Sequence, residues 1–325
     1  MSSDLREKAK RARVRKLVLA LVSVALFLAI GVFAHFLPFD TLLPAFAIPV
    51  RQEGEMRIHF LSVGEGDCTL VEFPEGDVLV VDAGDGSRQA DAAIQRYIKG
   101  LGSPALTLLA THADGDHIGG FPALIKTFGV KNIYAPAFGE DTPVYRKFLS
   151  TVEGADCPVE TIGRYDRIER ASGAYAVCIS PRSEEDADEN DASAVLYISY
   201  ADVNILLAAD ISATRERLLL REYLIDSTIF DSGPCRVRLE DVNILKVPHH
   251  GSAYSAYADF LGLVGAETAI VSAGAGNYYR HPSIEAVTAL KTANAACEVY
   301  RTDELGHIMI TISDGEYSVR TEKDL

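Results

Sequence analysis

A block of ten residues, Thr111-His-Ala-Asp-Gly-Asp-His-Ile-Gly-Gly120, constrains this chain more than any other feature. Four side chains of the kind that bind metal ions, two imidazoles and two carboxylates, fall within six residues of one another, directly after the apolar segment 106–110. Gly115 lets the backbone turn tightly, so that side chains on both sides of it can converge. A polar turn that only caps a helix needs fewer such groups. The block therefore predicts a metal site at the carboxyl end of a strand, where α/β sheets place their ligands.

Two further segments place ligand-type residues directly after apolar strands. Asp210 ends one of them, and His249 and His250 follow the other. Asp82 follows a third apolar strand and is suited to orient a ligand histidine from behind. A capping aspartate or a turn of surface histidines would explain each segment alone. Together with the first block, the segments indicate one shared site.

The segments around these residues alternate in type from Met56 onward, which is typical of an α/β protein. With 325 residues, of which 48% are apolar, the chain can bury a large core. There is no internal repeat and no sign of a second domain, so we expect one catalytic domain over 56–325. Strands are predicted over 57–63, 69–73, 78–82, 106–111, 176–180, 194–200, 204–209, 243–247, 269–272, 297–301 and 307–312, and helices over 88–99, 118–128, 213–223 and 283–292.

The amino terminus predicts a membrane anchor. Seven Lys and Arg residues stand in the basic tip 1–16, and residues 17–34 then carry no charge, in an apolar run that continues to 37. At ~1.5 Å per residue, the uncharged stretch makes about 27 Å of helix, close to the thickness of a bilayer core. The basic tip places the amino terminus in the cytoplasm, so we expect a single-pass protein of the cell membrane with its catalytic domain outside the cell. A proline-containing linker over 38–55 joins the span to that domain. A cleaved signal peptide ending near Ala47 is the alternative.

Charge and cysteine spacing narrow the classes of function. Beyond the basic tip the chain has 24 Lys and Arg against 44 Asp and Glu, a net charge of −20, which opposes general binding of polyanions unless a local patch or bound metal offsets it. The five cysteines show no C-x-x-C spacing, which excludes a zinc ribbon and a thioredoxin-type motif. No Gly-x-x-x-x-Gly-Lys loop and no Ser-His-Asp or Cys-His nucleophile motif is present.

The chemistry-bearing segments together resemble the metallo-β-lactamase superfamily, specifically the hydrolase domain of ComEC-type competence proteins. The resemblance rests on the His-x-Asp-x-Asp-His block, the strand that ends in Asp210 and the His-His-Gly-Ser segment. It extends over about 56–312, with supporting motifs at Leu61-Ser-Val-Gly-Glu-Gly-Asp67, Asn190-Asp-Ala-Ser193, His281-Pro282 and Thr302-Asp303 followed by Gly306. It implies an αββα sandwich with the site along one edge.

The resemblance also implies two divalent metal ions. The implied ligands are His112 and Asp114 for the first ion, Asp116, His117 and His249 for the second, and Asp210 as a bridge between them. Most members of the superfamily have a histidine at the position of Asp114, and this chain has no histidine between His117 and His249. The oxygen-rich ligand set therefore favours Mn²⁺ as readily as Zn²⁺. Ser62 and Glu65 stand where the ComEC-type branch usually has Asp and Gln.

Sequence alone leaves a choice between His249 and His250. Adjacent residues leaving a strand point in different directions, so we expect only one of them to bind metal. We assign His249 to the metal. His250 and His281 are then left, with Asp116, as the catalytic candidates that orient the substrate or move a proton.

Three functions remain open at this point. The first is hydrolysis of phosphodiester bonds by a metal-activated water, with DNA outside the cell as one such substrate. The second is hydrolysis of a carbonyl substrate such as a lactone, thioester or β-lactam. The third is a noncatalytic binding module on the same fold. The expected partners are the cell membrane, through the N-terminal helix, and nucleic acid or another phosphodiester.

Overall fold

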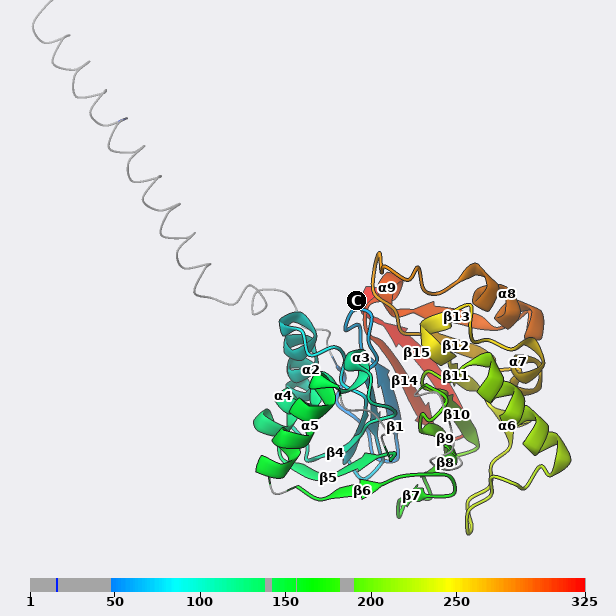
Figure 1. Cartoon of the computed structure of the whole chain (residues 1–325), viewed down its shortest axis with the longest axis horizontal. Helices are drawn as coiled ribbons and strands as arrows, with labels where there is room; N and C mark the ends of the chain where they lie inside the picture. The colour runs from blue at the N-terminus through cyan, green and yellow to red at the C-terminus, as the bar shows by residue number, and fades with distance from the viewer. Residues whose placement is uncertain (1–15, 17–47, 138–141, 156, 182–189, 325) are drawn as a thin grey trace, which may run out of the picture. The chain divides into compact units, whose positions relative to one another are not determined.

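Two mixed β-sheets face each other in the unit formed by residues 48–325 of the computed structural model (Figure 1). The structure describes residues 16, 48–137, 142–155, 157–181 and 190–324. The first sheet has the order β15 (Glu316–Thr321), β14 (Ile308–Ser313), β1 (Met56–Phe60), β2 (Thr69–Glu72), β3 (Val78–Val81), β4 (Leu106–Leu109), β5 (Val130–Ala135), β6 (Val159–Thr161). The second has the order β13 (Glu298–Arg301), β12 (Thr268–Val271), β11 (Ile244–Lys246), β10 (Val203–Leu207), β9 (Val195–Tyr200), β8 (Tyr175–Ser180), β7 (Arg167–Glu169).

Helices cover the outer face of each sheet, which gives four layers in the order helix, sheet, sheet, helix (Figure 1). The first sheet is covered by α2 (Arg88–Gly100), α4 (Phe121–Thr127) and α5 (Pro143–Gly154), and the second by α6 (Ala213–Ile225), α7 (Ala258–Val264) and α8 (Ile284–Ala293). The short helices α3 (Gly115–Ile118) and α9 (Thr302–Leu305) follow β4 and β13. Single turns of 3-10 helix lie at Leu239–Asp241, Pro248–Gly251 and Glu322–Asp324.

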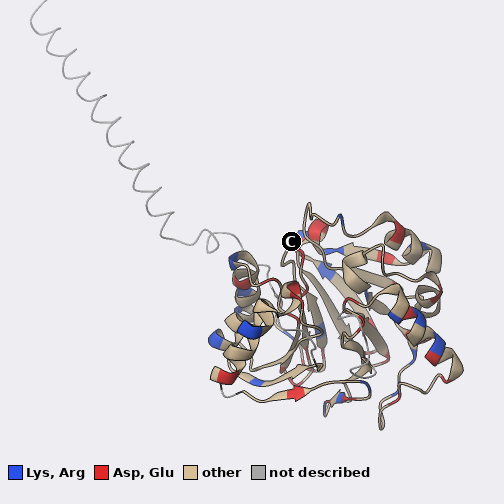
Figure 2. Cartoon of the chain, in the orientation of Figure 1, with Lys and Arg blue, Asp and Glu red and all other residues tan. Residues whose placement is uncertain are grey.

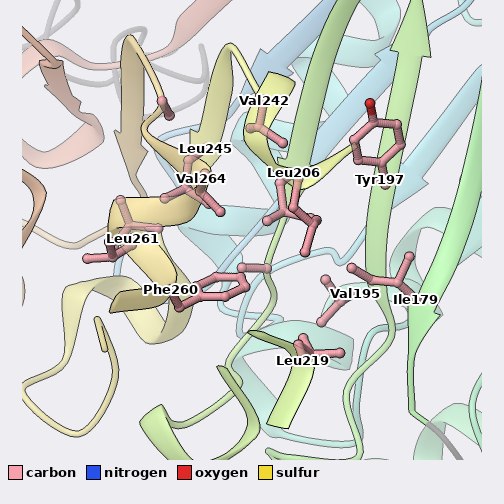
Figure 3. Packing of buried hydrophobic residues seen from close by; sticks show 14 of the residues in the cluster. Ile179, Val195, Tyr197, Leu206, Leu219, Val242, Leu245, Phe260, Leu261 and Val264 are labelled. Atoms are coloured by element: carbon pink, nitrogen blue, oxygen red, sulfur yellow. The ribbon is translucent and has the colours of Figure 1, made fainter. Parts of the chain in front are cut away.

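The alternation of side chains along a strand explains why two cores form. Val203, Ile205 and Leu207 of β10 belong to the core between the two sheets, whereas Leu206 faces the opposite way. Leu206 packs in a second core together with side chains of α6 and α7. Figure 3 shows this second core, where Leu219 and Phe260 lie near the labelled side chains of the sheet. A sheet that is buried on both faces needs apolar residues at every position, as in the unbroken apolar run 205–209.

The carboxyl ends of several parallel strands meet along one edge of the sandwich. In the first sheet β3 and β4 run parallel, and in the second β10, β11 and β12 do. Each of the ligand-type segments found in the sequence directly follows one of these strands. The fold therefore brings residues that are more than 100 positions apart in the chain to a common edge.

The structure confirms the predicted α/β class and the four-layer αββα arrangement. Several elements were not predicted from the sequence, namely β5, β6, β7, β15, α5, α7 and α9. The predicted anchor at 17–37, together with its signal-peptide alternative, lies outside the described residues and stays a prediction. Among the residues that the structure describes, no helix is long and apolar enough to cross a bilayer.

Candidate metal centre

The loop between β4 and α3 carries the densest set of ligand-type side chains. His112 and His117 are almost completely buried there, whereas Asp114 and Asp116 reach toward solvent with 44% and 38% of their side chains exposed. A second loop packs against this one through Gly66, at which an added Cβ would lie 2.1 Å from the carbonyl oxygen of Asp116. Only glycine fits such a close approach.

The chain turns sharply at the ends of the strands that lead into the site. Asp82 after β3, Ala209 after β10, and His249 and His250 after β11 all have left-handed backbone conformations, with φ between 48° and 59°. Such residues each cost on the order of 1 kcal/mol and gather at functional sites, where the surrounding structure holds them in place. Here the turns direct several strand ends toward one small volume.

Asp82 fixes the orientation of the first loop. Its Oδ1 accepts a hydrogen bond from the Thr111 backbone N–H at 2.8 Å, and its Oδ2 accepts from the Thr111 hydroxyl at 2.7 Å and from Nδ1 of His117 at 2.8 Å. The Thr111 oxygen in turn accepts from Nδ1 of His112 at 2.9 Å. Both imidazoles therefore carry their proton on Nδ1 and present Nε2 to the site. The predicted role of Asp82, orienting a histidine from behind, agrees with this geometry.

His250 has the same arrangement on the second sheet. Its Nδ1 donates to the backbone carbonyl of Ser272 at 3.0 Å, which again leaves Nε2 facing the site. The Nε2 atoms of His112, His117 and His250 are all buried, and none has a hydrogen-bond partner among the described residues. Three buried imidazole nitrogens without a hydrogen bond are costly unless something binds them.

Carboxylates complete the arrangement around these nitrogens. Asp210 Oδ2 lies 3.5 Å from Nε2 of His117 and 3.2 Å from Nε2 of His250, and Asp116 Oδ2 lies 3.5 Å from the latter. Two sets of ligand atoms, each lying within 4.8 Å of one another, are His112 with His117 and Asp210, and Asp116 with His117 and His250. Imidazole nitrogen and carboxylate oxygen are ligands for Zn²⁺ and Mn²⁺, so the residues present fit divalent metal ions.

The pKa values show an excess of negative charge at this place. Burial lowers the pKa of His250, but the carboxylates of Asp210 and Asp67 outweigh burial and raise it to about 10. The same opposition holds the pKa of His117 well above its usual value, because Asp210, Asp82 and Asp116 surround it. A bound cation would neutralise the same carboxylates.

Two charged residues without a role in the sequence interpretation belong to this site. Lys246 is buried in β11, forms an ion pair with Asp67, and places its ammonium nitrogen 3.6 Å from Asp210 Oδ1. Asp67 Oδ1 also lies 3.5 Å from Nδ1 of His250. The sequence did contain a signal for Lys246, since a single lysine stands inside the otherwise apolar strand Ile244–Lys246 and its continuation to Pro248. A charged group at such a position is retained only when it is paired.

The remaining predicted site residues line a pocket of about 170 Å³ beside the grouped atoms. Asp114, His249 and His281 are all at its wall, together with Glu65. The Asp114 side chain caps none of the α3 amides, and its Oδ2 lies 3.5 Å from Nε2 of His112. The structure thus brings the predicted site residues together at this edge of the sandwich, with Asp114, His249 and His281 outside the tight groups.

The placement of the paired histidines differs from the sequence assignment. His249 is more exposed, at 26% of its side chain, and its Nε2 lies 3.9 Å from Asp210, whereas His250 is 6% exposed and lies within 3.5 Å of both Asp116 and Asp210. The strand ends at Lys246, before the pair, and both histidines have left-handed backbones. The rule that neighbours on a strand point to opposite faces therefore does not apply to them, and the geometry favours His250 over His249 as the ligand.

The layered fold and the histidine–aspartate site at its edge define a metallo-β-lactamase-type protein. A sequence profile described as "Metallo-beta-lactamase superfamily" matches residues 61–275, so the chain belongs to that superfamily. Its members are mostly metal-dependent hydrolases, and the fold usually binds divalent metal ions.

The curated relatives are competence proteins of the ComEC type. "ComE operon protein 3" of Bacillus subtilis is 28% identical over 83% of this chain, and "Competence protein ComA" of Neisseria gonorrhoeae is 26% identical over 81%. The alignments cover 35% and 33% of those proteins, so this chain spans about a third of their length. A shorter match of 86 residues, 37% identical, covers 26% of this chain and 28% of "Hydroxyacylglutathione hydrolase" from Shewanella halifaxensis. Among solved structures, the metallo-beta-lactamase fold protein YhfI of Bacillus subtilis aligns over 82% of this chain and 100% of its own, with 12% identity and a TM-score of 0.48.

Proposed function

We propose that this protein is a metal-dependent hydrolase that cuts phosphodiester bonds with a metal-activated water. The observation that carries the proposal is the convergence of three buried Nε2 atoms, from His112, His117 and His250, on the carboxylates of Asp116 and Asp210. A noncatalytic binding module would not need such a ligand set. Substoichiometric metal in the purified protein would favour the module.

The site would hold two divalent ions, Zn²⁺ or Mn²⁺. His112 and Asp114 would bind the first ion, and Asp116, His117 and His250 the second. Asp210 would bridge the ions, because it forms one close group with His112 and His117 and also lies 3.2 Å from Nε2 of His250. Carboxylate oxygens make up half of this ligand set, which suits a hard ion such as Mn²⁺ as well as Zn²⁺.

Side chains at the pocket would transfer the proton and orient the substrate. Bound divalent ions would supply a water of lowered pKa and stabilise charge on the reacting oxygens. Asp116, with 38% of its side chain exposed, reaches the pocket and would accept a proton from the attacking water. His249 and His281 lie side by side, with ring centroids 5.8 Å apart, and burial lowers the pKa of both. They would therefore be neutral at neutral pH and would orient the substrate by hydrogen bonds.

DNA outside the cell is the phosphodiester we consider first, because the relatives that match most of this chain are competence proteins. The predicted N-terminal anchor would hold the hydrolase at the cell membrane with the site on the outer side. Likeness to a family is a weak guide to substrate, so substrate has to be measured.

A panel of reporter substrates tests the proposal. The protein loaded with Mn²⁺ or Zn²⁺ should hydrolyse bis(p-nitrophenyl) phosphate faster than carboxylic ester, thioester and β-lactam reporters. Asp210→Asn should lose about 10²-fold or more in rate, because it removes the charge that bridges the ions. Metal-loaded protein that turns over only the carbonyl reporters would refute the phosphodiester proposal.

Thioester hydrolysis is the second candidate, and one specific observation favours it. The 86-residue match to a hydroxyacylglutathione hydrolase is 37% identical, against 28% and 26% for the two competence proteins. It covers only 26% of this chain, whereas the competence proteins match along 83% and 81% of it. S-Lactoylglutathione belongs in the reporter panel for this reason.

A further inference from the structure

We propose that Tyr279, at the wall of the pocket, and the neighbouring Tyr278 form a stacking platform for a nucleobase, so that the substrates of this site are single-stranded nucleic acids. The inference rests on the proposed phosphodiesterase function and assigns its substrate class. Tyr278 is 87% exposed and Tyr279 is 66% exposed, four and five residues after the buried segment 271–274. Two such exposed aromatic rings beside a catalytic pocket are costly in water unless a ligand covers them.

A column of nearly parallel rings leads from the metal centre to this platform. The rings of His250 and His281 are inclined by only 15°, with centroids 6.2 Å apart, and those of His281 and Tyr279 by 21°, with centroids 5.6 Å apart. These are offset-stacked arrangements. Tyr279 is the outermost ring, so a further planar ring can continue the column from its exposed side. A base placed there would direct the strand that carries it along the column, so that a phosphodiester group of a neighbouring nucleotide comes near His250.

Tyr278 adds a wall to the platform. Its ring stands almost perpendicular to that of Tyr279, at 83°, with centroids 5.6 Å apart. A flat ring that stacks on Tyr279 would meet Tyr278 edge to face, which is a favourable arrangement for aromatic pairs. Sugars offer an aromatic ring only a face of C–H bonds, whereas every nucleobase offers a π-face.

The loop that carries the tyrosines is held in one conformation before any ligand binds. The side chain of Asn277 donates to the carbonyls of Gly274 and His281 at 3.0 and 2.7 Å, and its oxygen accepts from the His281 backbone N–H at 2.8 Å. The Tyr278 backbone N–H donates to Glu65 Oε1 at 3.1 Å. A platform fixed in this way loses little conformational entropy when it binds a ring.

The loop is also tied to the metal-binding segment. The Ser283 backbone N–H donates to the carbonyl of Gly251, the residue after His250, at 2.8 Å. A Cβ at Gly251 would lie 2.6 Å from that of Pro282, so only glycine allows this contact. The distance between platform and metal centre is therefore set by packed backbone.

The charge of the loop and the need for uncovered base faces favour a single strand over a duplex. Arg280 is the only Lys or Arg in the loop 273–283 and is exposed, in a domain that is otherwise strongly acidic. One cation beside the platform suits a single backbone phosphate. In a duplex the faces of the bases are covered by their neighbours, so a stacking side chain reaches only bases that are unpaired or turned out.

Tyr279→Ala, compared with Tyr279→Phe, tests the platform in the metal-loaded full-length protein. The two reporters are the 5′-(p-nitrophenyl phosphate) of a thymidine dinucleotide, whose second base can reach Tyr279, and methyl p-nitrophenyl phosphate, which carries no base. Tyr279→Ala should raise KM for the thymidine reporter by about 5- to 150-fold, leave its kcat within about twofold, and leave the methyl reporter unchanged. Tyr279→Phe keeps the ring and should behave as the parent protein. Tyr165→Ala, an exposed tyrosine that does not line the pocket, is the matched control.

An equal effect of Tyr279→Ala on both reporters would overturn the platform while leaving the phosphodiesterase proposal intact. If neither reporter is hydrolysed, the proposed function fails. The platform is then tested separately, by the binding of oligonucleotides. Fluorescence anisotropy would measure the binding of two strands that both have hydrolysis-resistant phosphorothioate links. One strand is an octathymidine, and the other is the same strand without its bases. Tighter binding of the base-bearing strand, lost in Tyr279→Ala and kept in Tyr279→Phe, would support the platform, and equal binding of the two strands would overturn it.

Discussion

His249 and His250 are neighbours in the chain but have different surroundings. His250 is held by the Ser272 carbonyl and faces Asp116 and Asp210, whereas His249 stands at the pocket wall beside His281. His250→Ala should therefore lose the second metal ion together with activity. His249→Ala should keep its metal and lose turnover, because it removes a group that orients the substrate. Metal content per protein and rate, measured for both variants, check this prediction.

The two variants serve as controls for each other, since each removes one imidazole from the same turn. Full metal in His250→Ala together with lost metal in His249→Ala would restore the assignment made from the sequence. A fall in metal content in both would mean that the two imidazoles share one ion.

Lys246 gives a second prediction at the scale of one residue. Its ammonium is the partner of the buried Asp67 carboxylate. Lys246→Met removes the nearest counterion of that buried carboxylate, which should lower the free energy of unfolding of the metal-free protein by about 3–5 kcal/mol. Urea unfolding in the presence of a chelator measures the loss.

A double variant separates the ion pair from the loss of packing. Lys246→Met combined with Asp67→Asn removes both charges and should recover part of the lost stability. Lys126→Met, at an exposed position of α4, should change stability by no more than about 0.5 kcal/mol. A double variant as unstable as the sum of its single variants would show that the pair is not coupled.

At the scale of elements, α6 fixes the segment that follows the paired histidines. Glu216 in its first turn is fully buried and accepts hydrogen bonds from the backbone N–H groups of Ala256 and Tyr257. Burial outweighs these hydrogen bonds and raises the pKa of Glu216 from 4.5 to about 7. Folding thus favours the neutral carboxyl. Its contribution to the free energy of unfolding is fully present below about pH 4.5 and is lost as the pH rises through about 7.

Glu216→Gln should flatten the pH dependence of stability in that window. The free energy of unfolding of the parent protein should fall between pH 5 and pH 8 by about 2–3 kcal/mol more than that of the variant. Urea unfolding at several pH values gives the two slopes, and Glu285→Gln, at an exposed position in the first turn of α8, should keep the slope of the parent. Parallel curves for Glu216→Gln and the parent would show that Glu216 does not titrate in this range.

The elements that the sequence predicted are those with unbroken apolar runs, such as β3 and β10. The elements it missed lack that signal for physical reasons. In β15 every second residue is exposed and polar, because this strand lies at the edge of its sheet. All three residues of β6 are exposed at the opposite edge, and α7 has only seven residues and contains Gly262. Edge strands and short helices are stabilised by their neighbours more than by their own pattern.

The sequence predicted the ligand-type residues of the site, because each of them directly follows an apolar strand. It did not predict the residues around them, because their roles depend on contacts across the two sheets. Lys246 and Asp67 are 179 positions apart and meet only in the folded chain. The choice between His249 and His250 depends on the left-handed backbone conformation of both residues, which the pattern of the preceding strand does not predict.

At the scale of the whole molecule, charge should govern the approach of a polyanionic substrate. Lys and Arg are scattered among Asp and Glu over the outer helices of both layers (Figure 2), and residues 17–325 carry a net charge of −20. Raising the salt concentration from about 10 to 100 mM shortens the screening length from about 30 to 10 Å and weakens this repulsion. KM for an octathymidine should therefore fall over this range.

Methyl p-nitrophenyl phosphate carries one charge and serves as the control, since its KM should change much less. Rates measured at four or five salt concentrations give both dependences. A KM for the octathymidine that rises steeply with salt would instead indicate counterion release from a basic surface.

The order of the strands has a consequence for how the protein is made. The first sheet contains β1 to β6, but its β1 pairs with β14, and β14 pairs with β15, the last strand of the chain. During synthesis β1 therefore has one unpaired edge until β14 emerges from the ribosome. His112 and His117 are synthesised more than 90 residues before Asp210 and His250 reach them. During translation the nascent chain thus holds only half of its site, and it gains full affinity for metal only after Asp210 and His250 have been synthesised.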